Sequence, residues 1–106
     1  MDKHPILIAD GDGSIVFWNG QAQRVFGHAP DQALGQTLDL IVPPEFREAH
    51  WRGFRAAITS GEAVVEGQAT PFPVRHADGE IAEHSGRLTL IRAPDGRVVG
   101  AMVVFD

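Results

Sequence analysis

A histidine that recurs with two aromatic residues at helical spacing is the feature of this sequence with the clearest chemical potential. Phe46, His50 and Phe54 are each four residues apart, so a helix would place them on one face. A neutral imidazole is a good metal ligand, and aromatic neighbours would give it apolar walls. Gly53 and Ala57 fall on the same side and leave a notch in that face. Either a core side chain or a flat ligand can fill the notch.

The segment 42–61 carries the signals of the helix that this face requires. Pro43 and Pro44 suit a helix entrance, where the missing proline N–H costs no hydrogen bond. Gly61 can adopt the left-handed conformation that ends a helix. Charged residues occupy most of the other positions, as in a helix half buried in a domain. We therefore expect a helix over about 44–60.

Apolar runs predict strands before and after this helix. The runs 5–9 and 14–18 flank an Asp-Gly turn signal and are expected to form a hairpin. Beyond the helix, the two prolines within 62–74 confine that segment to a sheet edge or to bulged pairing. The segment 81–91 alternates in polarity, and 98–105 is apolar on both faces, which is typical of a central strand.

Two short helices are expected between the first hairpin and the long helix. The segment 21–26 places its apolar residues on one side and is closed by Gly27. Asp31 can cap a further turn or two that stops at Gly35. The helices can cover one face of the sheet, so the other face is expected to meet a second subunit or a flanking helix.

The composition excludes several classes of function. A chain of 106 residues forms one domain, and the absence of cysteine excludes disulfides, thiolate nucleophiles and Cys-ligated zinc or iron–sulfur sites. The net charge of −5 argues against nucleic acid as a partner. No segment is typical of a membrane span or a signal peptide, so we expect a cytoplasmic protein without membrane contact. No hydroxyl nucleophile has a histidine and a carboxylate around it, so an enzyme is not expected.

Five segments in this order resemble the PAS sensory domain over nearly the whole chain: ILIADGDGSIVFWN, QAQRVFG, VPPEFR, HADGEI and APDGRVVGAMVVF. The resemblance implies an α+β fold, in which a five-stranded antiparallel sheet carries a helical block on one face and a ligand pocket lies between them. It also implies a single PAS domain over 1–106 that is part of a longer signalling protein. Such a domain passes its signal through dimer contacts to an output domain such as a histidine kinase or a diguanylate cyclase.

Within the family, AHWRGFRAAITSGE is similar to the heme-binding, FixL-like branch. In that branch a histidine on the longest helix ligates heme iron, and His50 stands at the matching position. The resemblance implies a b-type heme that senses a diatomic gas or the redox state of the iron. The arginine that holds oxygen in this branch is replaced here by Thr70, and His84 or Met102 could be a second axial ligand. The implied cofactor contacts are Phe46, Gly53, Phe54, Ala57, Val65, Leu88 and Met102.

Two other functions remain open. The chain could be a PAS interaction module without a prosthetic group, in which Trp51, Phe54 and Leu88 fill the pocket and the domain works by forming a homodimer. It could also hold a small organic ligand such as a carboxylate, for which Arg75 and Arg87 are the candidate partners.

Overall fold

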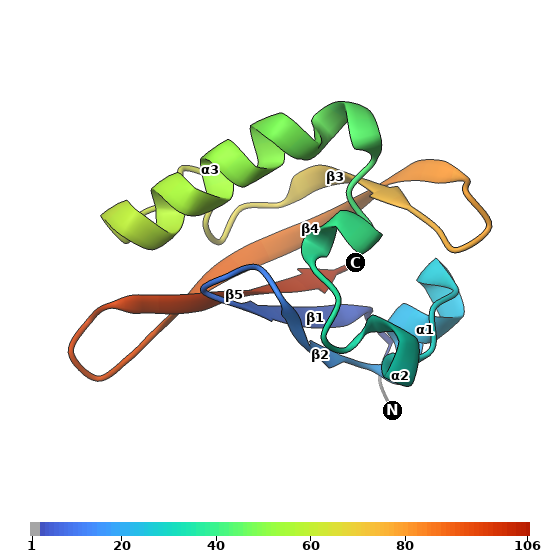
Figure 1. The fold of residues 1–106 in the computed structure, drawn as a ribbon, viewed down its shortest axis with the longest axis horizontal. Helices are drawn as coiled ribbons and strands as arrows, with labels where there is room; N and C mark the ends of the chain where they lie inside the picture. The colour runs from blue at the N-terminus through green and yellow to red at the C-terminus, as the bar shows by residue number, and fades with distance from the viewer. Residues whose placement is uncertain (1–2) are drawn as a thin grey trace.

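A computed structural model describes residues 3–106 as a curved sheet with helices across one face (Figure 1). All strand pairs are antiparallel, in the order β2-β1-β5-β4-β3. The expected α+β fold with five antiparallel strands is confirmed. The strands are β1 (Ile6–Asp10), β2 (Ile15–Trp18), β3 (Thr70–Arg75), β4 (Ile81–Arg92) and β5 (Val98–Phe105).

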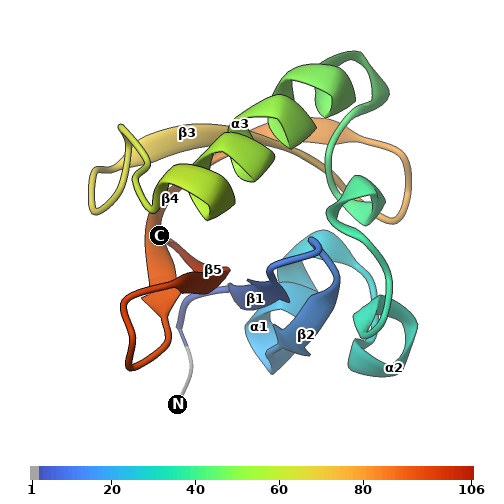
Figure 2. The same cartoon turned by 60° about the vertical axis from the view of Figure 1, so that its left-hand side comes forward.

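The helical block lies between β2 and β3 in the chain, and its longest helix crosses the sheet (Figure 2). Asn19 begins the first helix by accepting a hydrogen bond from the Ala22 N–H, as an N-cap residue does. The expectation that Asp31 caps the second helix is wrong. The N-cap residue of that helix is Ala29, and Asp31 lies inside its first turn. The elements are α1 (Gly20–Phe26), α2 (Pro30–Ala33), η1 (Leu38–Leu40), η2 (Pro44–Phe46) and α3 (Arg47–Ser60).

The long helix is present in two pieces. The first turn, η2, is a 3-10 helix, and the α-helix begins only at Arg47, so Phe46 lies at the junction. Gly61 ends α3 as expected: its φ of 78° is left-handed, and its N–H donates to the Ala57 carbonyl at 2.8 Å.

The strand expectations are confirmed in type and corrected at one boundary. The fifth strand is central and β3 is an edge strand, which fits the two prolines of β3 because an edge strand needs fewer backbone donors. The segment 62–69 forms turns rather than the start of β3. Glycine is required at Gly100, in β5, since a Cβ there would collide with the carbonyl oxygen of Ala9 on β1.

The pairing register divides the sheet into two faces. Leu7 pairs with Val103, and both belong to the hydrophobic core beneath the helices. Ile8 pairs with Met102, and these two point to the opposite face because successive side chains of a strand alternate. We call the half-buried residues Ile6, Ile8, Met102 and Val104 the outer patch.

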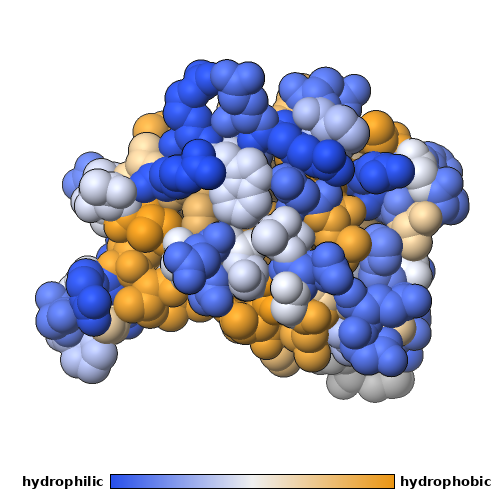
Figure 3. All heavy atoms as spheres, in the orientation of Figure 1, coloured by the Kyte–Doolittle hydropathy of each residue, from blue (hydrophilic) through white to orange (hydrophobic). Residues whose placement is uncertain are grey.

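No helix within residues 3–106 is long and apolar enough to cross a membrane. Apolar side chains reach the surface below α3 and over the strands at the lower edge of the molecule (Figure 3). This distribution leaves apolar area open on the sheet side of the domain, while the outward side of α3 is charged.

Candidate ligand cavity

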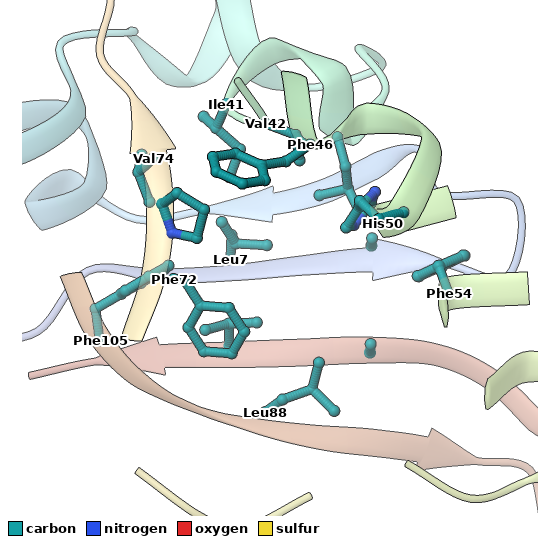
Figure 4. Close-up of a pocket in the computed structure, with 16 residues that line it drawn as sticks. Leu7, Ile41, Val42, Phe46, His50, Phe54, Phe72, Val74, Leu88 and Phe105 are labelled. Atoms are coloured by element: carbon teal, nitrogen blue, oxygen red, sulfur yellow. The ribbon is translucent and has the colours of Figure 1, made fainter. Parts of the chain in front are cut away.

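A cavity of about 370 Å³ lies between α3, the segment 38–46 and the inner face of the sheet. Its size falls within the range of about 300–1,000 Å³ that small-molecule sites occupy. Figure 4 shows Phe46 and His50 on one side, with Leu7, Phe72 and Leu88 on the other. Apart from His50, every side chain that lines the cavity is apolar.

The walls of the cavity come from strands of the sheet, from the segment before α3 and from α3 itself. Inward alternation on β1 and β5 supplies Leu7 and Val103 as a floor. The irregular segment before α3 supplies Ile41, which is 6% exposed. The first turns of α3 supply His50 and Phe54, four residues apart on one face. The cavity is thus formed by segments that lie far apart in the chain.

The imidazole of His50 is held beside this cavity with one nitrogen unsatisfied. Its Nδ1 is the buried side-chain polar atom without a hydrogen-bond partner in the part of the chain that the structure describes. The ring packs edge-on against Trp51, with centroids 4.9 Å apart, and is stacked by Phe54 at 6.0 Å. A buried polar atom left unpaired costs about 1–3 kcal/mol. A ligand that engages the ring would recover part of that cost.

Burial sets the charge of this imidazole. Desolvation lowers the pKa of His50, and the carboxylate of Asp39 opposes this effect only in part. The ring is therefore neutral at pH 7, which is the form that can ligate a metal.

The Trp51 ring, against which His50 packs, is held by a hydrogen bond between α3 and η1. The indole Nε1–H of Trp51 donates to Asp39 Oδ1 at 2.7 Å. Arg47 donates to the backbone carbonyl of Asp39 at 3.1 Å and lies beside the carboxylate of that residue. The Trp51 ring covers Gly13, where a Cβ would collide with it. The start of α3 is thereby tied to η1 and to the β1–β2 turn, which holds His50 in place.

Four of the residues expected to contact a ligand line one cavity: Phe46, His50, Phe54 and Leu88. Their part in binding a cofactor remains a prediction. Sequence reasoning missed other walls, above all Ile41 and Phe72. Their sequence signal was weak, because an irregular segment or a proline-rich edge strand has no periodicity that tells which way a side chain points.

Four other expected contacts lie elsewhere. Gly53 is exposed on α3, and a Cβ there would meet nothing within 4 Å beyond its chain neighbours and the backbone of its own helix. Ala57 is buried in a separate cluster that includes Val98, and Val65 lies in the turns before β3, outside the cavity lining. Met102 belongs to the outer patch, so the sheet separates it from His50. The expectation that Met102 reaches the cavity is corrected by this register.

His84 also lies outside the cavity, although it points inward as expected. Its ring packs against Phe26 and Phe105, and its Nε2 lies 2.9 Å from Nε2 of His76. This pair occupies the α1 side of the sheet, so His84 is not placed to be a second axial ligand opposite His50. Within residues 3–106, no group of three or more His, Cys, Asp or Glu side chains is arranged to hold a metal ion.

The two arginines considered for a carboxylate ligand are both exposed and outside the lining. Arg87 donates to the carbonyl of Gly67 at 2.7 Å instead. Trp51 does not line the cavity either, and Phe54 and Leu88 border it without filling it. The arrangement therefore offers an apolar chamber with a single neutral imidazole at its wall.

The structure combines a curved five-stranded antiparallel sheet, a long helix that crosses it and an apolar chamber between the two. This is the architecture of a class of sensory domains. The sequence model of the family described as the PAS fold matches residues 3–106, and the chain belongs to this family. It is a PAS sensory domain.

The chain is also similar to individual proteins and solved domains. The chain is 28% identical over 101 residues to the oxygen sensor protein DosP of Escherichia coli, covering 95% of this chain and 12% of that protein. A PAS domain from Colwellia psychrerythraea superposes with a TM-score of 0.81 at 21% identity, over 97% of this chain and 84% of that one. The PAS domain of the quorum-sensing receptor RpfR from Cronobacter turicensis, solved with C12:0, gives 0.76 at 16% identity, over 100% and 95%. The chain spans only about an eighth of the length of DosP.

Proposed function

We propose that this PAS domain binds b-type heme through His50 and reports a diatomic gas, or the redox state of the iron, to an output domain. The unpaired Nδ1 of His50, buried at the wall of an apolar chamber, is the observation that carries the proposal. The similarity to DosP, which is described as an oxygen sensor, supports it.

The residues of the cavity fit the faces of a porphyrin. His50 would ligate the iron, and Phe46, Phe54 and Leu88 would pack against the ring. Bound heme supplies an iron that changes oxidation state and takes a gas as ligand. Phe46 and Ala49 line the cavity and are also exposed, so the cavity reaches the surface beside them. Because no cationic side chain lines the cavity, the carboxylates of heme would lie at this opening.

The chain's own residues would convert occupancy into a structural change. Trp51 and Asp39 orient His50, and the floor strand β5 presents Val103 to the cavity and its neighbours Met102 and Val104 to the outer patch. A shift of the floor would therefore reach a surface available to another subunit. The proposal includes a homodimer, a cytoplasmic location, an output domain such as a histidine kinase or a diguanylate cyclase, and no catalysis by the domain itself.

Titration of the purified domain with hemin tests the heme site. We expect a sharp Soret band that saturates at one heme per chain. Replacing His50 with Ala should weaken binding by at least about tenfold, since losing even a residue that hydrogen-bonds to a metal ligand costs about 10–100-fold. His28→Ala is the matched control, because His28 is also half-buried but lies outside the cavity. A parent protein without the band, or a His50→Ala variant that keeps it unchanged, overturns the proposal.

A second candidate is an apolar organic ligand without iron. The carbon lining of the chamber favours it, and an RpfR PAS domain of the same fold is solved with C12:0. Native mass spectrometry of gently desalted protein, before any hemin is added, distinguishes the two. If the protein retains a bound mass in the range of a fatty acid and forms no Soret band with hemin, the ligand of the cavity is an apolar organic molecule and not heme.

A further inference from the structure

Two histidines of the β3–β4 hairpin, His76 at its turn and His84 in β4, face each other outside the ligand cavity. The Nε2 atoms of His76 and His84 lie 2.9 Å apart, and their ring planes meet at 43°. Both residues are half-buried, so the pair is accessible from the surface. At this distance one Nε2 carries a proton and the other presents its lone pair. Moving that proton to Nδ1 of the same ring would leave a lone pair on each Nε2, and a small turn of the two rings would direct both at one metal ion.

The surrounding structure holds both rings in this arrangement. The Phe26 ring packs against both, with centroids 5.9 Å from His76 and 5.3 Å from His84. Phe105 adds an edge contact to His84 at 6.3 Å. The backbone N–H of His76 donates to the carbonyl of Glu80 at 2.8 Å, which closes the hairpin beneath it. The two rings are therefore held side by side before any ion binds.

The electrostatic setting favours a cation at this point. Burial, with a smaller contribution from His76, lowers the pKa of His84, so the His84 ring is neutral at pH 7. Asp78, Glu80 and Glu83 are exposed along the same hairpin, in a chain of net charge −5. Their carboxylates would raise the local concentration of cations without being ligands.

We propose that His76 and His84 form a surface site for a divalent transition-metal ion of the Zn²⁺, Ni²⁺ and Cu²⁺ class, which imidazole ligands suit. Zinc bonds to nitrogen of about 2.0–2.1 Å in tetrahedral geometry set the two nitrogens roughly 3.3 Å apart. The present Nε2–Nε2 distance of 2.9 Å would open by a few tenths of an ångström as the rings turn toward the ion. No third His, Asp or Glu joins the pair among residues 3–106, so water or an external ligand completes the coordination. The proposal is independent of heme.

Isothermal titration of untagged, hemin-free protein with Zn²⁺ at pH 7.5 measures the site directly. We expect one saturable zinc ion per chain. His76→Gln and His84→Gln should each weaken its binding by at least about tenfold, because each removes one of two ligands. His4→Gln and His28→Gln are the controls and should bind as the parent does, since neither side chain belongs to the pair. Circular dichroism of each variant confirms that it is folded.

Proton NMR of the histidine rings in the parent protein provides a second readout that needs no variant. Zinc should shift the resonances of His76 and His84 together and leave those of His28 and His50 in place. Equal zinc affinity in the parent and in a His76→Gln/His84→Gln double variant overturns the proposal. Rings of His76 and His84 that stay unmoved at saturating zinc overturn it as well.

Discussion

At the scale of single residues, burial decides the charge of the histidines in this domain. His28, His50 and His84 all have a lowered pKa, and desolvation is the largest cause for each. Their neutral form is therefore favoured in the folded protein, whereas the unfolded chain titrates near the ordinary value of about 6.5. Between the lowered folded pKa and that value, the unfolded state binds more protons than the folded state.

The free energy of unfolding should consequently fall as the pH drops below about 6.5. Urea denaturation between pH 7.5 and pH 5.5 measures it. The His50→Gln variant should show a shallower dependence on pH, because one of the three groups that titrate differently in the two states is gone. Glu66 does not interfere: its pKa is lowered by Arg92 and by the backbone of Leu90, so it acts only in more acidic solution. Stability that rises on acidification within this window would contradict the assignment.

Residue types and spacing were enough to single out His50 but not to predict its surroundings. Four-residue spacing correctly placed His50 and Phe54 on one side of α3. The same reasoning wrongly added Gly53, because a position a little further round the helix already faces solvent. The partner of Trp51 is Asp39, twelve residues away in the short 3-10 helix η1, and no periodic pattern connects positions in two separate elements.

At the scale of elements, the hydrogen bond from Trp51 to Asp39 joins α3 to η1. Trp51→Phe keeps an aromatic ring over Gly13 and removes the N–H donor. We expect the free energy of unfolding to fall by about 1–2 kcal/mol, since the bond is to a charged but partly exposed carboxylate. Chemical denaturation measures the change.

The matched control for this element is Arg52→Ala, on the solvent-exposed surface of α3. Arg52 pairs with Glu48, and the two side chains are 73% and 91% exposed. Removing such a pair should change stability by less than about 0.5 kcal/mol. If Trp51→Phe changes the free energy of unfolding by as little as Arg52→Ala does, the hydrogen bond to Asp39 does not hold the helix in place.

Elements with a clear period were predictable from sequence, and elements without one were not. Alternation identified β4, and unbroken apolar character identified β5 as central. Val64 and Val65 predict the beginning of a strand at 62–69, yet this segment forms turns and Val64 is 93% exposed. The cavity itself depends on how the segment before α3 folds back over the sheet, and that path is set by tertiary packing.

At the scale of the whole molecule, the sheet presents one face to the helices and the outer patch to its surroundings. The hydrophobic clusters of the core contain none of Ile6, Ile8, Met102 or Val104. An apolar surface on a central strand is a typical place for a second subunit to pack. Assembly of two copies through this patch would connect the floor of the cavity to the neighbouring subunit.

A charge in the middle of the outer patch tests that arrangement. Met102 lies between Ile8 of β1 and Thr89 of β4, so Met102→Glu puts a carboxylate where a dimer would bury it unpaired. Such burial is costly, and we expect the dissociation constant of the dimer to rise by at least about tenfold, or 1.4 kcal/mol. Sedimentation of parent and variant over a range of concentrations measures it. Thr59→Glu, exposed on α3, adds the same charge away from the patch and should leave the dimer intact. A parent domain that stays monomeric at the highest concentration, or a Met102→Glu variant that associates as tightly as the parent, would mean that this face is not the subunit interface.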